Sequence, residues 1–156
     1  MKKILFVCTG NTCRSCMAEA IFNNMATDGN YIASSAGVNA CEGENASVGA
    51  AEALKSLWGI DSQNHRARQL NISAIIDSDI ILTMTERHCQ AVRSSFPEYR
   101  NKVFTLKEYI SEKNPVGAPY DIADPYGMPF QVYQKCAVEI KHAVEKLIEI
   151  LKRESI

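Results

Sequence analysis

Residues 7–15 read Val7-Cys8-Thr9-Gly10-Asn11-Thr12-Cys13-Arg14-Ser15. The apolar run of residues 4–6 precedes this stretch, and an amphipathic pattern over residues 17–22 follows it. An apolar run, a short loop with glycine and asparagine, and then an amphipathic pattern are typical of a strand, a tight turn and a helix N-terminus. The stretch therefore predicts a strand–loop–helix unit with Cys8 at the carboxyl end of the first strand.

The loop has the residue types of an anion site. Backbone N–H groups that converge at a helix N-terminus bind anions. Gly10 and Asn11 are the residue types that tolerate a left-handed backbone, and the fork of Arg14 matches two oxygens of one phosphate. In the positive field of such a loop we expect Cys8 to be a thiolate. These types predict a nucleophile beneath a bound phosphate, which is the chemistry of a phosphatase.

The cysteine spacing also fits two other kinds of protein. Cys8, Cys13 and Cys16 follow the C-x4-C-x2-C spacing of plant-type iron–sulfur proteins, and Cys13 with Cys16 forms a C-x-x-C pair of the thioredoxin type. Neither interpretation explains Asn11 and Arg14. We therefore favour phosphate chemistry and keep a thiol-redox or iron–sulfur protein as the alternative.

Composition limits the remaining possibilities. The chain has 156 residues, 46% of them apolar and 22% charged, which is typical of one globular domain covering residues 1–156. The formal net charge of -1 predicts no nucleic-acid or membrane partner. Six cysteines without a disulfide-type framework, and no signal peptide, predict a cytoplasmic protein. No pattern calls for a cofactor or metal, and the oligomeric state is left open.

Strand patterns alternate with helix patterns, which predicts a parallel sheet with helical crossovers. We expect an α/β, three-layer, single-domain fold in which helices flank a central four-stranded parallel sheet. Ligands of such sheets bind at the carboxyl ends of the strands, where Cys8 lies. The expected strands are 2–7, 31–36, 79–84 and 102–105, the expected helices are 15–28, 46–58, 85–95 and a long one from 130, and 111–128 is expected to be a long surface loop.

That long loop contains two carboxylates. Asp124 precedes Pro125, which would stiffen the segment and help to aim the carboxyl group. A group that leaves from phosphorus needs a proton, so a carboxylic acid above the loop would be able to act as the general acid. Asp-Pro is also an ordinary turn former, and Asp121 suits either a contact with a substrate cation or a solvated turn. From spacing alone these alternatives stay open.

Taken together, these segments resemble the low-molecular-weight protein tyrosine phosphatase family. The C-x5-R-S loop at residues 8–15 is followed by Met17-Ala18-Glu19-Ala20, and further similar segments lie at residues 34–37, 65–69 and 124–126. The resemblance implies that Cys8 forms a cysteinyl-phosphate, that Asp124 is first acid and then base, and that inorganic phosphate is product and inhibitor. It implies phosphate-binding roles for Thr9, Gly10, Asn11, Thr12, Cys13, Arg14 and Ser15.

The resemblance also implies supporting roles. Ser15 would hydrogen-bond the Cys8 sulfur, and Asn11 would hold the loop through partners at Ser35 and His65. Cys13 would be able to form a reversible disulfide with Cys8. Two features lie outside this pattern: Cys16 stands where the family usually has proline, and His88 and His142 match no family residue and are expected to be ordinary helix residues.

The residue Thr12 bears on the substrate. In the tyrosine-directed branch this position is usually aliphatic, whereas threonine resembles the bacterial protein-arginine phosphatase branch. A hydroxyl is able to accept a guanidinium N–H, and an aliphatic side chain is not. Tyr126 supplies one aromatic wall for a substrate. We therefore expect hydrolysis of phosphoarginine in proteins, with protein-tyrosine phosphatase activity as the alternative; arsenate reduction would need a relay of cysteines, of which Cys89 is one candidate.

Overall fold

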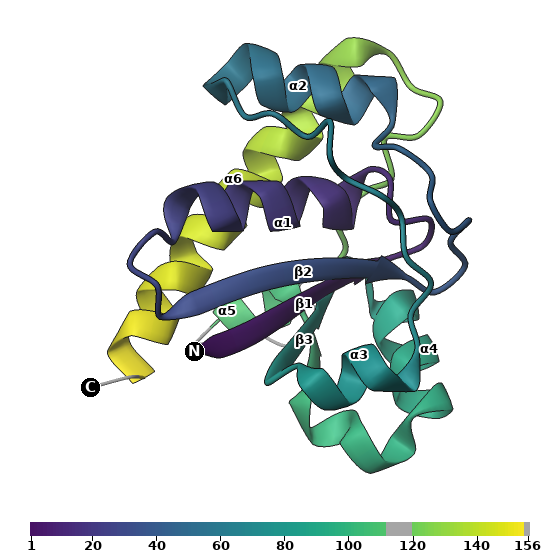
Figure 1. The fold of residues 1–156 in the computed structure, drawn as a ribbon, viewed down its shortest axis with the longest axis vertical. Helices are drawn as coiled ribbons and strands as arrows, with labels where there is room; N and C mark the ends of the chain where they lie inside the picture. Colours follow the sequence, from purple (N-terminus) through teal and green to yellow (C-terminus); the bar gives the residue numbers. More distant parts are fainter. Residues whose placement is uncertain (112–119, 155–156) are drawn as a thin grey trace.

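Four short apolar segments form the central sheet of the computed structural model, which describes residues 1–111 and 120–154. All neighbouring strands are parallel, in the order β2-β1-β3-β4 (Figure 1). β1 pairs with β2 along its whole length, from Lys2 opposite Tyr31 to Cys8 opposite Gly37. The four-stranded parallel sheet expected from the sequence is therefore confirmed. The strands are β1 (Lys2–Cys8), β2 (Tyr31–Gly37), β3 (Ile80–Thr83) and β4 (Val103–Thr105).

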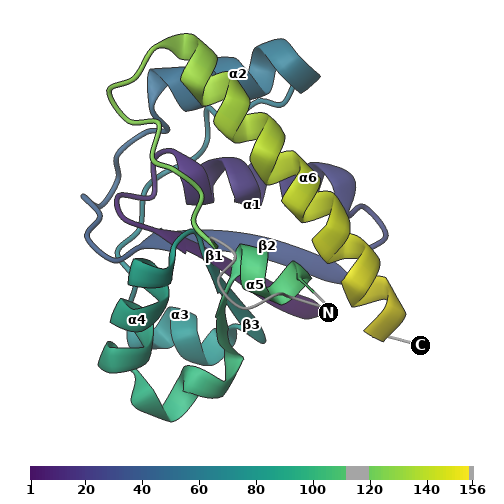
Figure 2. The same cartoon turned by 180° about the vertical axis from the view of Figure 1, so that it is seen from behind.

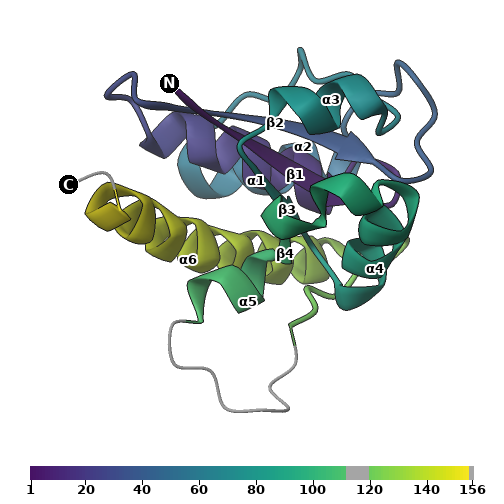
Figure 3. The same ribbon diagram turned by 90° about the horizontal axis from the view of Figure 1, so that it is seen from below.

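Helices cover both faces of this sheet. On one face lie α1 and α6, with α2 packed against them; α3 and α4 lie on the other (Figures 1 and 2). The short helix α5 lies beside α6 (Figure 3). The three expected layers are thus present. The helices are α1 (Arg14–Met25), α2 (Val48–Trp58), α3 (Ile72–Asp77), α4 (Glu86–Ser95), the 3-10 helix η1 (Pro97–Lys102), α5 (Leu106–Ile110) and α6 (Phe130–Glu154).

Alternation along β1 divides the interior into two cores. Ile4 and Phe6 are fully buried against α1 and α6, and Leu5 and Val7 are fully buried in the core under α3 and α4. Successive side chains of a strand point to opposite faces, so a strand that is apolar throughout needs a helical layer on each side. Each such side chain contributes roughly 1.5–3 kcal/mol on burial. β1 is therefore the centre of the fold, and its end carries Cys8.

Several helices begin or end at residues other than those expected from the sequence. α1 ends at Met25 instead of residue 28, because Ala26 leaves the helical conformation with ψ 79°; Asp28 then forms a turn by accepting a hydrogen bond of 3.1 Å from the N–H of Asn30. The expected helices 46–58 and 85–95 begin later, because Ser47 and Thr85 are their N-caps. The short helices α3 and α5 were not predicted, since one or two turns show too little periodicity.

α6 agrees with the prediction of a long closing helix from Phe130. Its apolar stripe includes Tyr133, Ile140, Val144 and Leu147, all buried in the core that α6 shares with α1, α2 and the sheet. Of the expected loop over residues 111–128, residues 112–119 lie outside the described part, and the rest leads to the site. Across the described residues, no helix has the length and apolarity needed to span a membrane.

Candidate active site

The loop between β1 and α1 turns its carbonyl groups outward. Three loop carbonyls accept hydrogen bonds of 2.9 Å from the segment that follows β2. Among the described residues, no acceptor is bonded to the backbone N–H groups of residues 9–15. Unpaired N–H groups at the N-terminus of α1 make an anion-binding site. The three carbonyls are those of Cys8, Thr9 and Thr12, and their donors are the N–H groups of Val38, Asn39 and Ser47.

The left-handed residue of the loop is Asn11, with φ 59°. Gly10 does not have a positive φ, so the expectation that both residues supply left-handed backbone holds for Asn11 alone. A left-handed conformation costs a non-glycine residue roughly 1–2 kcal/mol. The Asn11 side chain offsets this cost, because its amide oxygen accepts a 3.0 Å hydrogen bond from the N–H of Arg68. The Asn11 carbonyl also lies 2.6 Å from Nε2 of His65.

A chain of hydrogen bonds runs from Asn11 to the sulfur of Cys8. The Asn11 amide nitrogen donates to the hydroxyl oxygens of Ser15 and Ser35, at 2.8 Å each. The Ser15 oxygen lies 2.8 Å from Sγ of Cys8. Because Ser15 already accepts from Asn11, its own O–H is available to donate to the sulfur of Cys8. Ser35 in turn donates to Glu19, a residue to which the sequence assigned no role.

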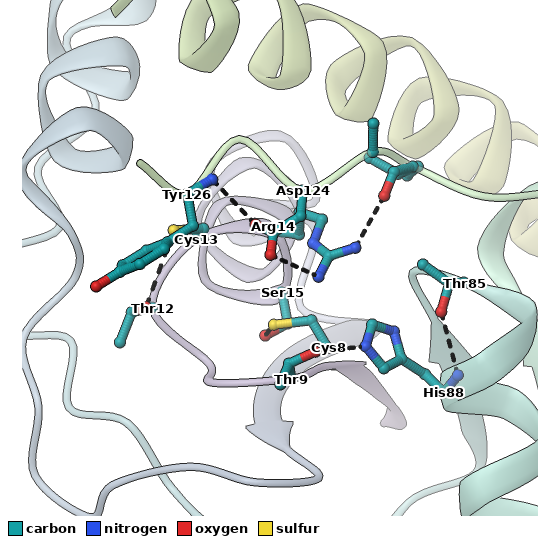
Figure 4. Close-up of polar contacts among 12 residues, drawn as sticks. Cys8, Thr9, Thr12, Cys13, Arg14, Ser15, Thr85, His88, Asp124 and Tyr126 are labelled. Carbon is teal, nitrogen blue, oxygen red and sulfur yellow. Dashed lines mark hydrogen bonds and ion pairs between the residues drawn. The ribbon is translucent and has the colours of Figure 1, made fainter. Parts of the chain in front are cut away.

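Arg14 is buried in the loop, with 5% of its surface exposed. Its Nη1 donates to the carbonyl of Ile122 at 2.9 Å, and its Nη2 lies 3.6 Å from Oδ2 of Asp124 (Figure 4). Within the part of the chain that the structure describes, Nε of Arg14 has no hydrogen-bond partner. Buried polar groups are almost always paired, and this donor is available to an oxygen of a bound anion.

Asp124 lies above the loop on the segment before α6 (Figure 4). Its side chain is 53% exposed, and its Oδ1 accepts a 3.0 Å hydrogen bond from the N–H of Tyr126. Asp121 is placed differently, since its Oδ1 accepts from the N–H of Glu86 at the start of α4. Of the two carboxylates, the structure brings Asp124 over Cys8 and uses Asp121 to cap a helix.

These residues surround a small pocket of about 240 Å³. Its floor is the loop, and Asp124 and Tyr126 form part of its wall. Thr12 is half-buried in the lining, and Tyr126 is 71% exposed. The pocket combines a thiol, an anion-binding floor and a carboxyl group, which are the groups that phosphoryl transfer through cysteine requires. Its lining consists of Cys8, Thr9, Gly10, Thr12, Cys13, Arg14, Glu44, Asp124 and Tyr126.

The expectation for His88 was wrong. It is buried on α4, and its Nε2 lies 2.8 Å from Oγ1 of Thr9 in the loop (Figure 4). Burial and the nearby Arg14 guanidinium disfavour the charged ring and lower the pKa of His88 to about 4. At neutral pH the ring is therefore neutral. A histidine three residues into a short helix gave no signal in the sequence that it would reach a loop 79 residues away.

The other five cysteines are free, and one of them, Cys13, lines the same pocket as Cys8. Cys16 is buried, and burial together with Glu19 raises the pKa of its thiol well above the ordinary range. Cys13 is buried, 3.2 Å from the hydroxyl of Ser47. Cys89 lies in the core on the opposite face of the sheet from Cys8. No group of three or more potential metal ligands gathers among residues 1–111 and 120–154.

Comparison with known proteins agrees with this geometry. The family model for "Low molecular weight phosphotyrosine protein phosphatase" matches residues 3–156. A protein-arginine-phosphatase from Geobacillus stearothermophilus is 43% identical over 152 residues, 97% of each chain. A solved low molecular weight protein tyrosine phosphatase from T. tengcongensis is 46% identical, with a TM-score of 0.88 over 96% of this chain and 99% of that one.

A further solved structure is that of the YwlE arginine phosphatase with its active-site cysteine replaced by a phosphorylated serine. It is 39% identical, with a TM-score of 0.88 over 96% of this chain and 95% of that one. The match to the family model covers almost the whole sequence, and relatives above 30% identity extend over almost all of it. The chain therefore belongs to the low molecular weight phosphotyrosine protein phosphatase family and is an enzyme.

Proposed function

We propose that this enzyme hydrolyses phosphoarginine in proteins through a cysteinyl-phosphate on Cys8. The observation that carries the phosphatase assignment is the pocket floor, where the buried Nε of Arg14 and the N–H groups of residues 9–15 are unpaired in the described part of the chain. These donors match the oxygens of a phosphoryl group as charge redistributes during transfer.

In the first step the Cys8 thiolate attacks phosphorus. The S–P bond forms as the bond from phosphorus to the leaving nitrogen breaks, and Asp124 gives its proton to that nitrogen. In the second step Asp124, now a carboxylate, takes a proton from water, whose oxygen attacks phosphorus. The S–P bond then breaks, inorganic phosphate leaves, and the Ser15 hydroxyl at 2.8 Å stabilises the returning thiolate. Bound phosphate would compete with substrate for the same donors.

Thr12 supports phosphoarginine as the substrate. Its side chain lines the pocket, where its hydroxyl is able to accept an N–H of the guanidinium group. The name of the relative from Geobacillus stearothermophilus points to the same substrate. Phosphotyrosine is the second candidate, because Tyr126 offers an exposed aromatic wall. Free cysteines at all six positions support a reducing, cytoplasmic location.

The test measures kcat/KM on phosphoarginine and phosphotyrosine peptides of the same sequence, under reducing conditions. We expect the wild type to prefer phosphoarginine, and Thr12→Ile to shift the ratio toward phosphotyrosine by about tenfold, since one hydrogen bond to a charged group is lost and the slot becomes more apolar. Thr12→Ser, which keeps the hydroxyl, is the matched control. A wild type that prefers phosphotyrosine would overturn the phosphoarginine assignment and leave the mechanism intact.

A further inference from the structure

A second carboxylate residue lines the catalytic pocket, and the mechanism above does not use it. Glu44 stands on the segment between β2 and α2 and borders the same pocket of about 240 Å³ as Cys8 and Arg14. Its backbone is held in place, since its carbonyl accepts a 2.7 Å hydrogen bond from the N–H of Ala67. That bond ties Glu44 to the segment that also anchors Asn11 through Arg68. The position of Glu44 beside the pocket is thus part of the fold.

The side chain of Glu44 is exposed, and among the described residues no hydrogen bond or ion pair uses its carboxylate. Glu42, two residues earlier, is different, because its Oε1 accepts a 2.7 Å hydrogen bond from the N–H of Gln69. Glu42 therefore has a structural partner within the protein. The carboxylate of Glu44 is available to a ligand.

The charge of Glu44 suits only one kind of substrate. The pocket floor is built for a phosphoryl dianion, and a carboxylate on the wall repels that dianion. The repulsion is offset only if the substrate carries a cation next to its phosphoryl group. A phenyl ring has no such charge, whereas a guanidinium group has both the charge and N–H donors in a planar fork.

We propose that Glu44 is a specificity-determining residue, whose carboxylate accepts N–H hydrogen bonds from the guanidinium group of phosphoarginine. The inference rests on the proposed function. The pocket lies below the roughly 300 Å³ typical of ligand sites, so each wall is close to the group that enters it. Thr12 and Glu44 then select in different ways: Thr12 through a hydrogen bond accepted by an uncharged hydroxyl, and Glu44 through the attraction between its negative charge and the guanidinium cation.

The test uses the full chain with blocked amino acids as substrates, N-acetyl phosphoarginine methylamide and N-acetyl phosphotyrosine methylamide. Neither carries another cation, so a basic neighbour in a peptide cannot produce the effect. For Glu44→Gln we expect kcat/KM on phosphoarginine to fall by roughly threefold to tenfold, with no fall on phosphotyrosine. The difference should shrink in about 0.5 M salt, since partly exposed charges are screened.

Glu52→Gln on α2 is the matched control, because it removes the same charge from an exposed position that does not line the pocket. A change in the substrate ratio no larger than that of the control would overturn the role of Glu44, as would an equal fall on both substrates. An effect found only with peptides that carry basic neighbours would assign the contact to those neighbours instead. Wild-type preference for phosphotyrosine would instead overturn the proposed function itself.

Discussion

The phosphate loop and the rim of the pocket above it differ in exposure and in hydrogen bonding. Asn11 and Ser15 in the loop are fully buried, and each of their side chains bonds to another part of the site. At the rim, Tyr126 is 71% exposed, and Glu44 uses only its backbone to hold its place. Many contacts hold the loop in the conformation seen in the structure. The rim has side chains that remain available to a substrate.

The difference separates two tasks. Stabilising a transferring phosphoryl group needs donors that do not reorganise during the reaction, and the buried network of the loop supplies that rigidity. Choosing between phosphorylated side chains needs groups that contact the part of the substrate beyond phosphorus. Loop substitutions should therefore reduce stability and turnover together, and rim substitutions should change activity or selectivity while the fold stays intact.

The largest effect is expected from the nucleophile. Cys8→Ser should reduce turnover by about 10⁴-fold or more, because a serine hydroxyl at this position lacks the reactivity of a thiolate. Binding of inorganic phosphate, measured by calorimetry, should persist, since the loop donors remain. Turnover within tenfold of the wild type would contradict the role of Cys8.

At the rim, Asp124→Asn should reduce kcat/KM by about 10²–10⁴-fold on phosphoarginine, whose leaving nitrogen needs a proton. The loss should be much smaller on p-nitrophenyl phosphate, because its leaving group is stable without one. Thermal unfolding should change little, as the Asp124 side chain is half-exposed. Asp121→Asn is the matched control, since it keeps an acceptor for the N–H of Glu86. Equal losses on both substrates would remove Asp124 as the acid.

In the loop, Asn11→Ala should lower the free energy of unfolding by about 2–4 kcal/mol, because the left-handed backbone loses its side-chain bonds and its partners are left unpaired. Chemical denaturation measures this change. Asn39→Ala, on the exposed segment beside the loop, is the control and should change stability by less than about 0.5 kcal/mol. If the two variants were equally stable, the loop would not depend on the Asn11 network.

The smallest effect concerns pH. The pKa of His88 is about 4 in the folded protein and near 6.5 when unfolded. Between these values the unfolded chain binds a proton that the folded chain does not, so stability falls as the pH is lowered through this range, by about 2 kcal/mol between pH 7 and pH 5. His88→Gln should reduce that slope, and His142→Gln, at an exposed position of α6, should retain it. Chemical denaturation at pH 7 and at pH 5 measures the stability lost between these two pH values. A loss in His88→Gln equal to that of the wild type would contradict the buried neutral state of His88.

Local sequence patterns predicted much of the fold and the position of the loop. The apolar alternation of β1, the loop ending in Arg14 and Ser15, and the stripe of α6 each depend on residue type and spacing within a few turns or strands. Such patterns act over neighbouring residues, so they are visible before the chain is folded. They were sufficient for the parallel sheet and for the position of Cys8 at the carboxyl end of β1.

Other features were decided only by the tertiary structure. The hydrogen bond between His88 and Thr9 joins residues 79 positions apart, Glu19 accepts a hydrogen bond from Ser35 between α1 and β2, and Glu44 reaches the pocket from the segment after β2. None of these contacts has a local signature, because each depends on how the layers pack against one another. The left-handed conformation at Asn11, and not at Gly10, also depends on the tertiary structure, because the distant residue Arg68 donates a hydrogen bond to the Asn11 side chain. Packing between layers brings these side chains together, and sequence spacing alone does not encode it.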